Sequence, residues 1–390
     1  MSETTNPQGT NPATVAWADP ARQALFRQWL DRSAATHALR PDTLRIASAD
    51  ASFRRYLRID SDAGTRIIMD APPDKEDCRP FVQVASLMAQ AGLNVPRVLD
   101  WDEAHGFMLL SDLGTRTMIE AVDRENADAN RELYMRAVDA LIAWQLASKP
   151  GVLPDYDEAL LARELALFPD WYLERHRGVK VEGSVRDTLD ATFKLIIARN
   201  LASAPVYVHR DFMPRNLMMP GSTAEDRLAA GPPQGKTAPS GGSEDTAVPS
   251  VGAKFLGVLD FQDAVYGPIT YDIASLMRDA FLSWDEEFVL DITIRYWQKA
   301  LKAGLPVDPD FGEFYRAVEW MGLQRHLKVA GIFARLTLRD GKPKYLADTP
   351  RFIAYIRSTA SRYRELTPLL KLVDEVEGTD LSNAFSFGRL

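Results

Sequence analysis

The chain has 390 residues, of which 46% are hydrophobic, so it can form two domains or one large two-lobed unit with a sizeable core. Its formal net charge of -8 at pH 7 and its lack of a basic stripe argue against a nucleic-acid partner and against binding to anionic membranes. The single cysteine, Cys78, excludes an internal disulfide and a cysteine-rich metal site.

The beginning of the sequence has none of the features of a targeting segment. Residues 1–16 are polar, with neither the basic start nor the apolar run of a signal peptide, and we expect a disordered tail there. No stretch approaches the roughly 20 apolar residues that a membrane-spanning helix needs. These patterns predict a cytoplasmic protein without a membrane partner.

Residues 17–113 are predicted to form a small β-rich lobe. A helix is expected over 21–30, because Leu25, Phe26 and Trp29 fall on one of its faces. Alternating apolar residues and intervening turn residues then predict a five-stranded antiparallel sheet and one further helix. The strands are expected at 44–46, 55–59, 66–69, 98–99 and 107–110, and the helix at 81–91.

Residues 114–390 are predicted to form a larger, mostly helical lobe. The helices are expected at 133–147, 158–175, 185–202, 271–284, 287–303, 311–338 and 350–376. A β-rich lobe followed by a helical one is a bilobal α+β architecture. Residues 221–254, rich in Gly, Pro, Ser, Thr and Ala, are predicted to be a disordered insert without a function of its own.

Two short stretches carry the chemistry. A β-rich run at 206–208 leads into His209-Arg210-Asp211, with Asn216 five residues after the aspartate, and a second run at 255–259 ends at Asp260. This is the kinase pattern H-R-D-x-x-x-x-N followed by a strand and D-F. We predict that Asp211 is the catalytic base, and that Asn216 and Asp260 bind Mg²⁺ beside ATP, because both offer hard oxygen ligands.

The spacing of these ligands constrains the fold between them. Asn216 and Asp260 are 44 positions apart, and removing the 34 residues of the insert leaves 10, which suffices for a tight hairpin. His209 is expected to brace the loop through a backbone hydrogen bond. Asp272, near the start of an apolar helix, is expected to cap that helix or brace a buried loop. Arg210 and Arg215 can each neutralise a carboxylate or reach a phosphate, and both readings stay open.

The polar turn at 48–54 lies where kinases place a phosphate-covering loop. It contains no glycine, so the usual phosphate-binding pattern is missing. Ser52 and nearby backbone amides, with Arg54 or Arg55 supplying charge, are candidates for binding the ATP phosphates. A solvated hairpin explains the same residues equally well.

Two further candidates concern the nucleotide. The third predicted strand lacks the lysine that kinases use on the phosphates, and Lys75 is the nearest replacement, although a plain surface lysine is the commoner reading. The segment 110–114, which includes Leu110 and Asp112, joins the lobes, and we expect its backbone to bind adenine.

The predicted helix at 311–338 carries an apolar stripe on which Arg325 also falls. A charge on a buried face must be paired or must face a polar cavity. Arg325 therefore either pairs with an acid such as Asp272 or Asp279, or lines the acceptor pocket together with Asp279.

Other residues of the helical lobe have simpler expected roles. His326 and Lys328 fall on other faces of the same helix, where solvent exposure is expected. Trp284 offers an apolar platform for a sugar ring, although packing in the core explains it as well.

These motifs resemble the aminoglycoside phosphotransferase and choline kinase superfamily, which has a protein-kinase-like fold. A more specific resemblance is to bacterial anomeric N-acetylmuramate/N-acetylglucosamine kinases. It is carried by the segments 50–56, 69–81, 259–264, 267–272 and 324–329.

The resemblance implies ATP- and Mg²⁺-dependent phosphorylation of the C1 hydroxyl of N-acetylmuramic acid and N-acetylglucosamine. It also implies a uridylyltransferase that acts next, in peptidoglycan recycling. The glycine-free turn and the missing strand lysine depart from the superfamily but fit this subfamily. N-acetylmuramate carries a lactyl carboxylate, with which Arg325 or Lys328 could pair.

Two alternatives remain open. The first is a kinase for another small alcohol, such as an aminoglycoside, choline or homoserine, which would keep the catalytic residues and change the acceptor pocket. The second is a nucleotide-binding pseudokinase. The presence of Asp211, Asn216 and Asp260 together argues against it, since a protein without catalysis has no need of all three.

Overall fold

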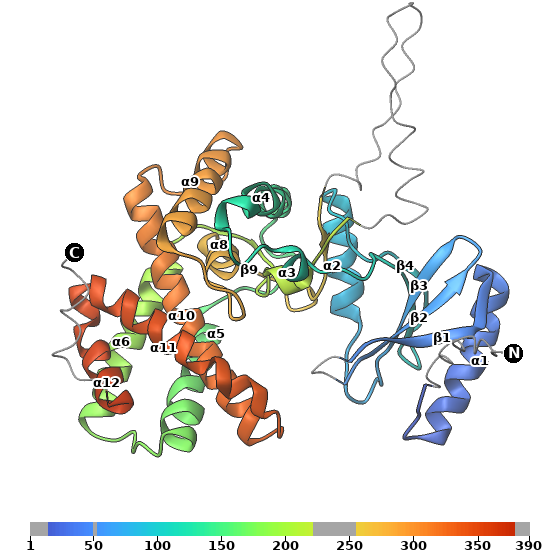
Figure 1. Cartoon of the computed structure of the whole chain (residues 1–390), viewed down its shortest axis with the longest axis horizontal. Helices are drawn as coiled ribbons and strands as arrows, with labels where there is room; N and C mark the ends of the chain where they lie inside the picture. The colour runs from blue at the N-terminus through green and yellow to red at the C-terminus, as the bar shows by residue number, and fades with distance from the viewer. Residues whose placement is uncertain (1–14, 50–52, 221–254, 379–390) are drawn as a thin grey trace, which may run out of the picture. The chain divides into compact units, whose positions relative to one another are not determined.

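The computed structural model describes residues 15–49, 53–220 and 255–378 (Figure 1). The chain divides into two compact units, the first from Met1–Thr117 and Met218–Gln262, and the second from Met118–Leu217 and Asp263–Leu390. Most of the predicted tail and the predicted insert at 221–254 lie outside the described residues. Within the described ranges, no helix is long and apolar enough to cross a membrane.

The first unit contains the predicted five-stranded antiparallel sheet, with the strand order β1-β2-β3-β5-β4. A two-residue turn joins β2 to β3, and Gly64, which pairs with Ser61, adopts the φ of +106° that this tight connection requires. The strands are β1 (Leu39–Ala49), β2 (Arg55–Ser61), β3 (Gly64–Asp70), β4 (Val98–Asp102) and β5 (Phe107–Ser111).

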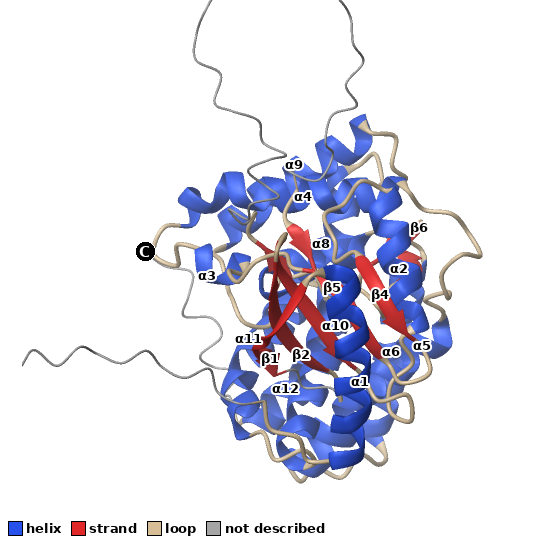
Figure 2. Ribbon diagram, turned by 90° about the vertical axis from the view of Figure 1, so that its right-hand side faces the viewer, coloured by secondary structure: helices blue, strands red, loops and turns tan. Residues whose placement is uncertain are grey.

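Helix α1 (Pro20–His37) covers one face of this sheet (Figures 1 and 2). Its N-terminus is capped by Asp19, whose side chain accepts a hydrogen bond from the Ala21 amide at 2.8 Å. The helix runs well beyond the predicted 21–30 and buries Phe26 and Trp29 against the sheet. Helix α2 (Arg79–Gln90) closely matches its prediction.

The segment that carries Asp260 is fastened to the first unit. Strand β8 (Gly257–Val258) pairs with β7 (Leu217–Met218), and the Val258 amide donates to the Asn94 carbonyl at 2.8 Å. A Cβ atom at Gly257 would lie 2.9 Å from side-chain atoms of both Leu113 and Met218, so only glycine fits there. The chain segments that follow Asn216 and precede Asp260 therefore pair with each other, and the predicted connection between them at 221–254 lies outside the described residues.

In the second unit, helices pack around the 28-residue α10 (Phe311–Leu338), whose bounds match the prediction (Figures 1 and 2). The other elements are α3 (Met118–Ala121), η1 (Ala127–Asn130), α4 (Arg131–Leu146), α5 (Glu158–Leu167), η2 (Phe168–His176), α6 (Ser184–Leu201), β6 (Pro205–Val208), η3 (Pro214–Asn216), β9 (Val265–Pro268), α8 (Thr270–Met277), α9 (Glu286–Lys302), η5 (Pro343–Asp348), α11 (Thr349–Arg362), η6 (Arg364–Leu366) and α12 (Thr367–Glu377).

Three predicted helices were wrong in detail. The helix predicted at 271–284 ends at Met277, because Arg278 leaves helical geometry at φ -122° and ψ 59°. The helix predicted at 350–376 is two helices, since Tyr363 is extended. The helix predicted at 158–175 passes into the π-helical η2 at Phe168, where Pro169 has no amide hydrogen to donate.

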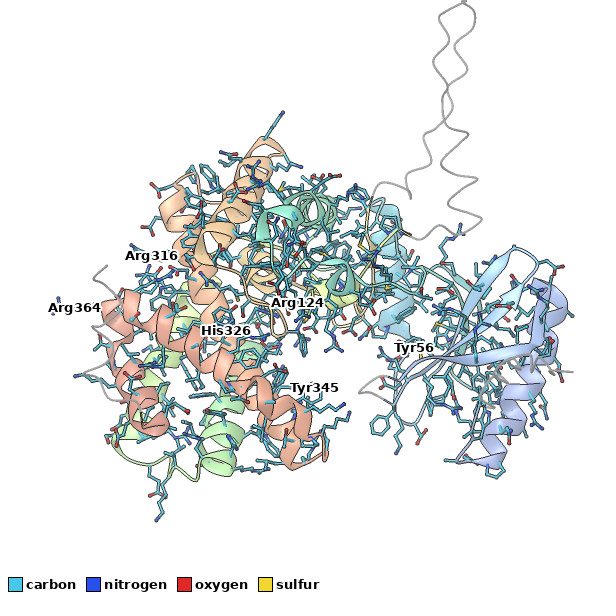
Figure 3. All side chains as sticks on the ribbon, in the orientation of Figure 1. Tyr56, Arg124, Arg316, His326, Tyr345 and Arg364 are labelled. Atoms are coloured by element: carbon cyan, nitrogen blue, oxygen red, sulfur yellow. The ribbon has the colours of Figure 1, made fainter. Side chains whose placement is uncertain are left out.

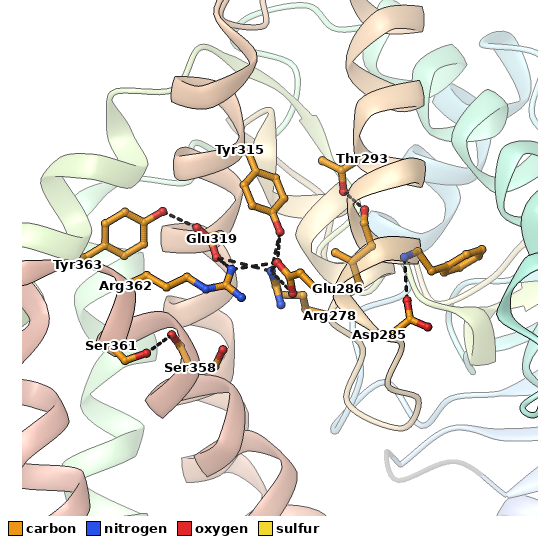
Figure 4. Close-up of polar contacts among 12 residues, drawn as sticks. Arg278, Asp285, Glu286, Thr293, Tyr315, Glu319, Ser358, Ser361, Arg362 and Tyr363 are labelled. Atoms are coloured by element: carbon orange, nitrogen blue, oxygen red, sulfur yellow. Dashed lines mark hydrogen bonds and ion pairs between the residues drawn. The ribbon is translucent and has the colours of Figure 1, made fainter. Parts of the chain in front are cut away.

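A network of charges fixes the chain just after α8 (Figure 4). The buried Arg278 guanidinium lies 3.2 Å from Glu286 and donates to the Tyr315 hydroxyl at 3.0 Å. The buried Glu319 of α10 accepts hydrogen bonds from Arg362 and Tyr363. The loop between α8 and α9 is thereby tied to α10 and to the end of α11.

Helix α10 also makes one very close contact with the backbone of α5. A Cβ atom added at Gly331 would lie 2.2 Å from the Leu167 carbonyl oxygen, a backbone atom that cannot swing aside. At Gly322, in the same helix, the nearest atom would be Arg278 Cδ at 3.3 Å, which belongs to a flexible side chain.

We therefore expect Gly331→Ala to destabilise the fold by about 1–3 kcal/mol or more, because it forces α10 and α5 apart. Gly322→Ala is the matched control, and its higher helix propensity should offset the local adjustment to within about 1 kcal/mol. Urea unfolding of both variants measures the difference. Equal stability of the two would contradict the close contact.

Candidate functional site

The predicted catalytic loop follows β6 in the second unit, and the Asp272 carboxylate holds its first two residues. This side chain, on α8, accepts hydrogen bonds from the His209 amide at 2.7 Å and the Arg210 amide at 3.0 Å. Arg210 has a φ of +77°, in the left-handed region that a bulky side chain rarely adopts. The loop-bracing role predicted for Asp272 is therefore present in the structure.

The remaining loop residues fix the backbone of Asp211. Its amide donates to His209 Nδ1 at 3.2 Å, and Asn216 Nδ2 donates to the Asp211 carbonyl at 2.9 Å. Because the amide nitrogen of Asn216 is used in this way, its oxygen lies at the other end of the planar group. Asp211 itself is half-buried.

Burial raises the pKa of Asp272 to about 7, although the His209 and Arg210 amides favour the charged form. The nearby Asp211 carboxylate adds to this rise, whereas Arg325 opposes it. The anchor of the loop thus titrates in the neutral range.

A second carboxylate, Glu164 of α5, lies at the centre of a buried network behind the loop. It accepts ion pairs from Arg210 at 2.6 Å and from Lys328 of α10 at 2.7 Å. Its other oxygen accepts hydrogen bonds from Gln324 at 2.9 Å and Tyr156 at 2.5 Å. Burial opposes its ionisation, but Lys328 and Arg210 outweigh burial and lower the pKa of Glu164 to about 2.

The sequence analysis missed Glu164, although a signal was available. Glu164 lies between Leu161 and Leu165 on the buried stripe of α5, and both leucines are fully buried. The reasoning that identified Arg325 as a buried charge applies equally to this position.

Arg325 supports the loop from α10. Its Nη1 donates to the Arg210 carbonyl at 2.7 Å, and its guanidinium carbon lies 4.7 Å from the centre of the Tyr271 ring. Burial would lower its pKa, but Tyr271, Asp211 and Asp272 raise it, so the group is charged. Arg325 thus acts electrostatically on Asp211 and is held by a backbone oxygen of the same loop.

The prediction that His326 and Lys328 are exposed was wrong. Lys328 is only 9% exposed, because Glu164 and the Tyr271 hydroxyl receive its ammonium group. His326, labelled in Figure 3, is 2% exposed and stacks on the Tyr355 ring of α11 at 4.5 Å. Burial and Arg278 lower its pKa to about 3, so the imidazole is neutral.

The early end of α8 places Asp279 and Trp284 in a loop. Asp279 is 2% exposed; it accepts a hydrogen bond from the Phe281 amide at 3.3 Å, and its Oδ2 has no hydrogen-bond partner among the described residues. Burial raises its pKa to about 6. Trp284 is half-buried and donates to the Tyr134 hydroxyl at 2.7 Å.

Asp260 lies in the first unit, two residues after the end of β8. Like Arg210 it is a non-glycine residue in the left-handed region, with a φ of +63°. Its Oδ1 accepts a hydrogen bond from Gln262 Nε2 at 2.9 Å. Three described non-glycine residues have positive φ, and two of them lie in the two predicted motifs.

The nucleotide-site candidates of the first unit have the following contacts. Arg54 pairs with Glu76 at 3.0 Å, and Arg55 pairs with the buried Asp70 at 2.5 Å. Lys75 is 52% exposed and lies 3.4 Å from the exposed Asp74.

The candidates in the segment at 110–114 are more enclosed. Leu110 is buried within β5, and Asp112 pairs with Arg58 at 2.6 Å and also accepts the Gly114 amide. Ser52 lies outside the described residues.

Comparisons with known proteins give one consistent picture. The model of the phosphotransferase enzyme family matches residues 43–230 and 251–307. An N-acetylmuramate/N-acetylglucosamine kinase from Pseudomonas aeruginosa is 46% identical, covering 91% of this chain and 97% of that protein. A protein of the same name from Neisseria meningitidis is 44% identical, covering 94% and 99%.

The solved structures agree on the fold. An ethanolamine kinase from Plasmodium vivax superposes with a TM-score of 0.55 at 10% identity, covering 88% of this chain and 92% of that one. The predicted fold class, a protein-kinase-like α+β fold with an antiparallel sheet and a mostly helical part, is confirmed.

The raised pKa of Asp272 predicts a pH dependence. The folded protein binds this proton more tightly than the unfolded chain, so the contribution to stability is present at low pH and is lost as the pH rises through about 7. The free energy of unfolding of the wild type, minus that of Asp272→Asn, should fall by about 3 kcal/mol between pH 5 and pH 8. Denaturant unfolding at both pH values measures it, and a difference that is constant or rises would contradict the assignment.

The Glu164 network predicts a second stability effect. Glu164→Gln leaves two buried cations without a carboxylate, so we expect a loss of about 3–5 kcal/mol. Removing one cation as well, in Glu164→Gln/Lys328→Met, should recover part of this loss, and the exposed Glu174→Gln is the control. Thermal and denaturant unfolding provide the measurement. A double variant that is no more stable than the single one would show that charge balance is not the cause.

Proposed function

Because the chain belongs to the phosphotransferase enzyme family, we propose that it transfers the γ-phosphoryl group of ATP to the anomeric C1 hydroxyl of N-acetylmuramic acid and N-acetylglucosamine. The observation that carries this proposal is the 44–46% identity, over more than nine tenths of the chain, to relatives named for these two sugars. A catalytic loop held by Asp272 and Arg325 supports it.

Asp211 is the proposed catalytic base. As the C1 oxygen bonds to the γ-phosphorus and ADP leaves, the hydroxyl proton passes to the Asp211 carboxylate. The ring oxygen of the sugar makes an anomeric hydroxyl more acidic than an ordinary alcohol, so a carboxylate of modest basicity suffices. The hydrogen bonds of His209 and Asn216 to the Asp211 backbone keep this carboxylate in one place.

Asn216 and Asp260 are the proposed ligands of Mg²⁺. A carboxamide oxygen and a carboxylate fit this ion, which prefers oxygen ligands and shares the nucleotide phosphates. When bound, Mg²⁺ supplies positive charge that neutralises the phosphate oxygens during transfer. The Asn216 side chain suits this role because its nitrogen is directed to the Asp211 carbonyl, which leaves its oxygen at the opposite end.

The proposed nucleotide contacts divide into two groups. The backbone at Leu110 and Asp112 would bind adenine, and Ser52, Arg54, Arg55 and Lys75 are the candidates for the phosphates. Among the basic candidates, the Lys75 ammonium is the one with a mostly exposed side chain and only an exposed partner. We therefore favour Lys75 in the place of the missing strand lysine.

The proposed acceptor contacts come from α10 and from the loop after α8. The Asp279 Oδ2, buried and without a described partner, can accept a hydrogen bond from a sugar hydroxyl. Trp284 is held by Tyr134 and can pack against a sugar ring. Arg325 would act by holding the loop beside the acceptor.

Cationic acceptors are less favoured at this site, although the ethanolamine kinase shares the fold. Arg210 and Lys328 are paired with Glu164, but the charged Arg325, which acts electrostatically on Asp211, disfavours an ammonium-bearing alcohol. A sugar 1-phosphate product would serve a uridylyltransferase, and a cytoplasmic reaction is part of the proposal because ATP is the proposed phosphoryl donor.

The proposed function is tested by phosphorus NMR of the product made from ATP and each sugar. We expect a resonance coupled to the anomeric proton, with Asp211→Asn lowering kcat by roughly 10²–10⁴-fold because the base is lost. The exposed Asp190→Asn, on α6, is the control and should keep full activity. A phosphate on C6, or full turnover by Asp211→Asn, would refute the assignment.

A further inference from the structure

The two proposed acceptor sugars differ in charge. N-acetylmuramate carries a lactyl carboxylate and N-acetylglucosamine does not, so a basic group that meets this carboxylate would set the preference between them. The inference below rests on the proposed function. The basic side chains around the loop differ in the contacts that they already make.

Two of these cations are already neutralised. Arg210 and Lys328 both pair with Glu164, at 2.6 and 2.7 Å, and Lys328 also donates to the Tyr271 hydroxyl at 3.1 Å. Lys328 is 9% exposed. Pairing with a substrate carboxylate would require Lys328 to leave a buried ion pair, which costs several kcal/mol.

Two others are buried. Arg325 is 4% exposed and gives its Nη1 to the Arg210 carbonyl, while its Nε has no hydrogen-bond partner among the described residues. Arg278 is 6% exposed and pairs with Glu286. Because the Arg325 side chain is buried and holds the loop, an exposed cation is better placed to meet the acceptor carboxylate.

Arg215 differs from these four cations in its exposure and in its contacts. It is exposed, and no ion pair or side-chain hydrogen bond joins it to another residue of the described ranges. It lies in the turn η3, directly before Asn216 and four residues after Asp211. Its guanidinium carbon lies 4.5 Å from the centre of the Phe281 ring.

Phe281, on which the Arg215 guanidinium lies, is itself held in place by two contacts. Its ring packs on the ring of Phe333 of α10, at 5.9 Å between centroids. Phe281 also lies two residues after Asp279, and its amide donates to the Asp279 carboxylate. The Arg215 guanidinium is thereby held between the catalytic turn and the loop that carries the orphaned Asp279 oxygen.

We propose that Arg215, held over the ring of Phe281, binds the carboxylate of the acceptor and makes the acidic amino sugar the preferred substrate. A guanidinium that lies over an aromatic ring keeps N–H groups that can form a bidentate pair with a carboxylate. The same positive charge disfavours an ammonium-bearing acceptor at this place. Asp279 then binds a neutral hydroxyl of either sugar.

The test is steady-state kinetics of the full chain with three acceptors: N-acetylmuramate, its neutral lactamide, and N-acetylglucosamine. Arg215→Gln should raise KM for N-acetylmuramate about tenfold, the loss expected for one charge-assisted pair. KM for the two neutral acceptors should change less than about twofold, and Arg215→Lys should recover part of the affinity. Because Arg215 is exposed, thermal unfolding of each variant should match the wild type.

The matched control is Arg351→Gln, since this residue also lies near Asp279. Arg351 donates to the Ala280 carbonyl at 3.1 Å and is expected to show no selectivity. A selective loss in Arg351→Gln instead would overturn the proposal. An equal fall of kcat with all three acceptors in Arg215→Gln would overturn it too, since that pattern is typical of contact with the transferred phosphoryl group. If the wild type phosphorylates none of the acceptors, the proposed function itself fails, a result distinct from both.

Discussion

The catalytic loop depends on one buried carboxylate. Asp272 accepts the amides of His209 and Arg210, and with them it holds the backbone turn that brings Asp211 forward. A carboxylate with no exposed surface is a costly way to satisfy two amides, as its raised pKa shows. The turn is also unusual, because Arg210 has a left-handed φ. Arg325 holds the same turn from its carbonyl side, so donors and acceptors on both sides determine its shape.

Electrostatic balance around this loop comes from α10 and α5 together. Helix α10 brings Arg325 and Lys328 to the loop, whereas α5 brings Glu164. The carboxylate of Glu164 is shared by two cations and receives two neutral donors, so each of its oxygens is satisfied. This arrangement explains how so many charged groups can be buried next to Asp211.

The elements with strong local signals could be predicted from the sequence. The five strands follow from alternation and turn residues, and the role of Asp272 follows from its place near the start of an apolar helix. Lys328 could not be placed, because its burial depends on Glu164, a residue distant in the sequence. The end of α8 was missed for a similar reason, since Arg278 turns away to meet Glu286 and Tyr315. Local patterns describe one face of one helix, whereas these positions are decided by partners on other helices.

The length of helix α8 constrains how a new acceptor specificity can evolve. Asp272, in its first turn, holds the loop that carries Asp211, and Asp279 lies two residues past the end of the helix at Met277. The backbone leaves helical geometry at Arg278, so α8 sets where Asp272 lies relative to the start of the loop that carries Asp279. Inserting or deleting one residue in α8 would swing Asp272 by about 100° relative to the start of that loop. New acceptors should therefore arise by exchange of side chains in the loop after α8, while the length of this helix stays constant across functional descendants.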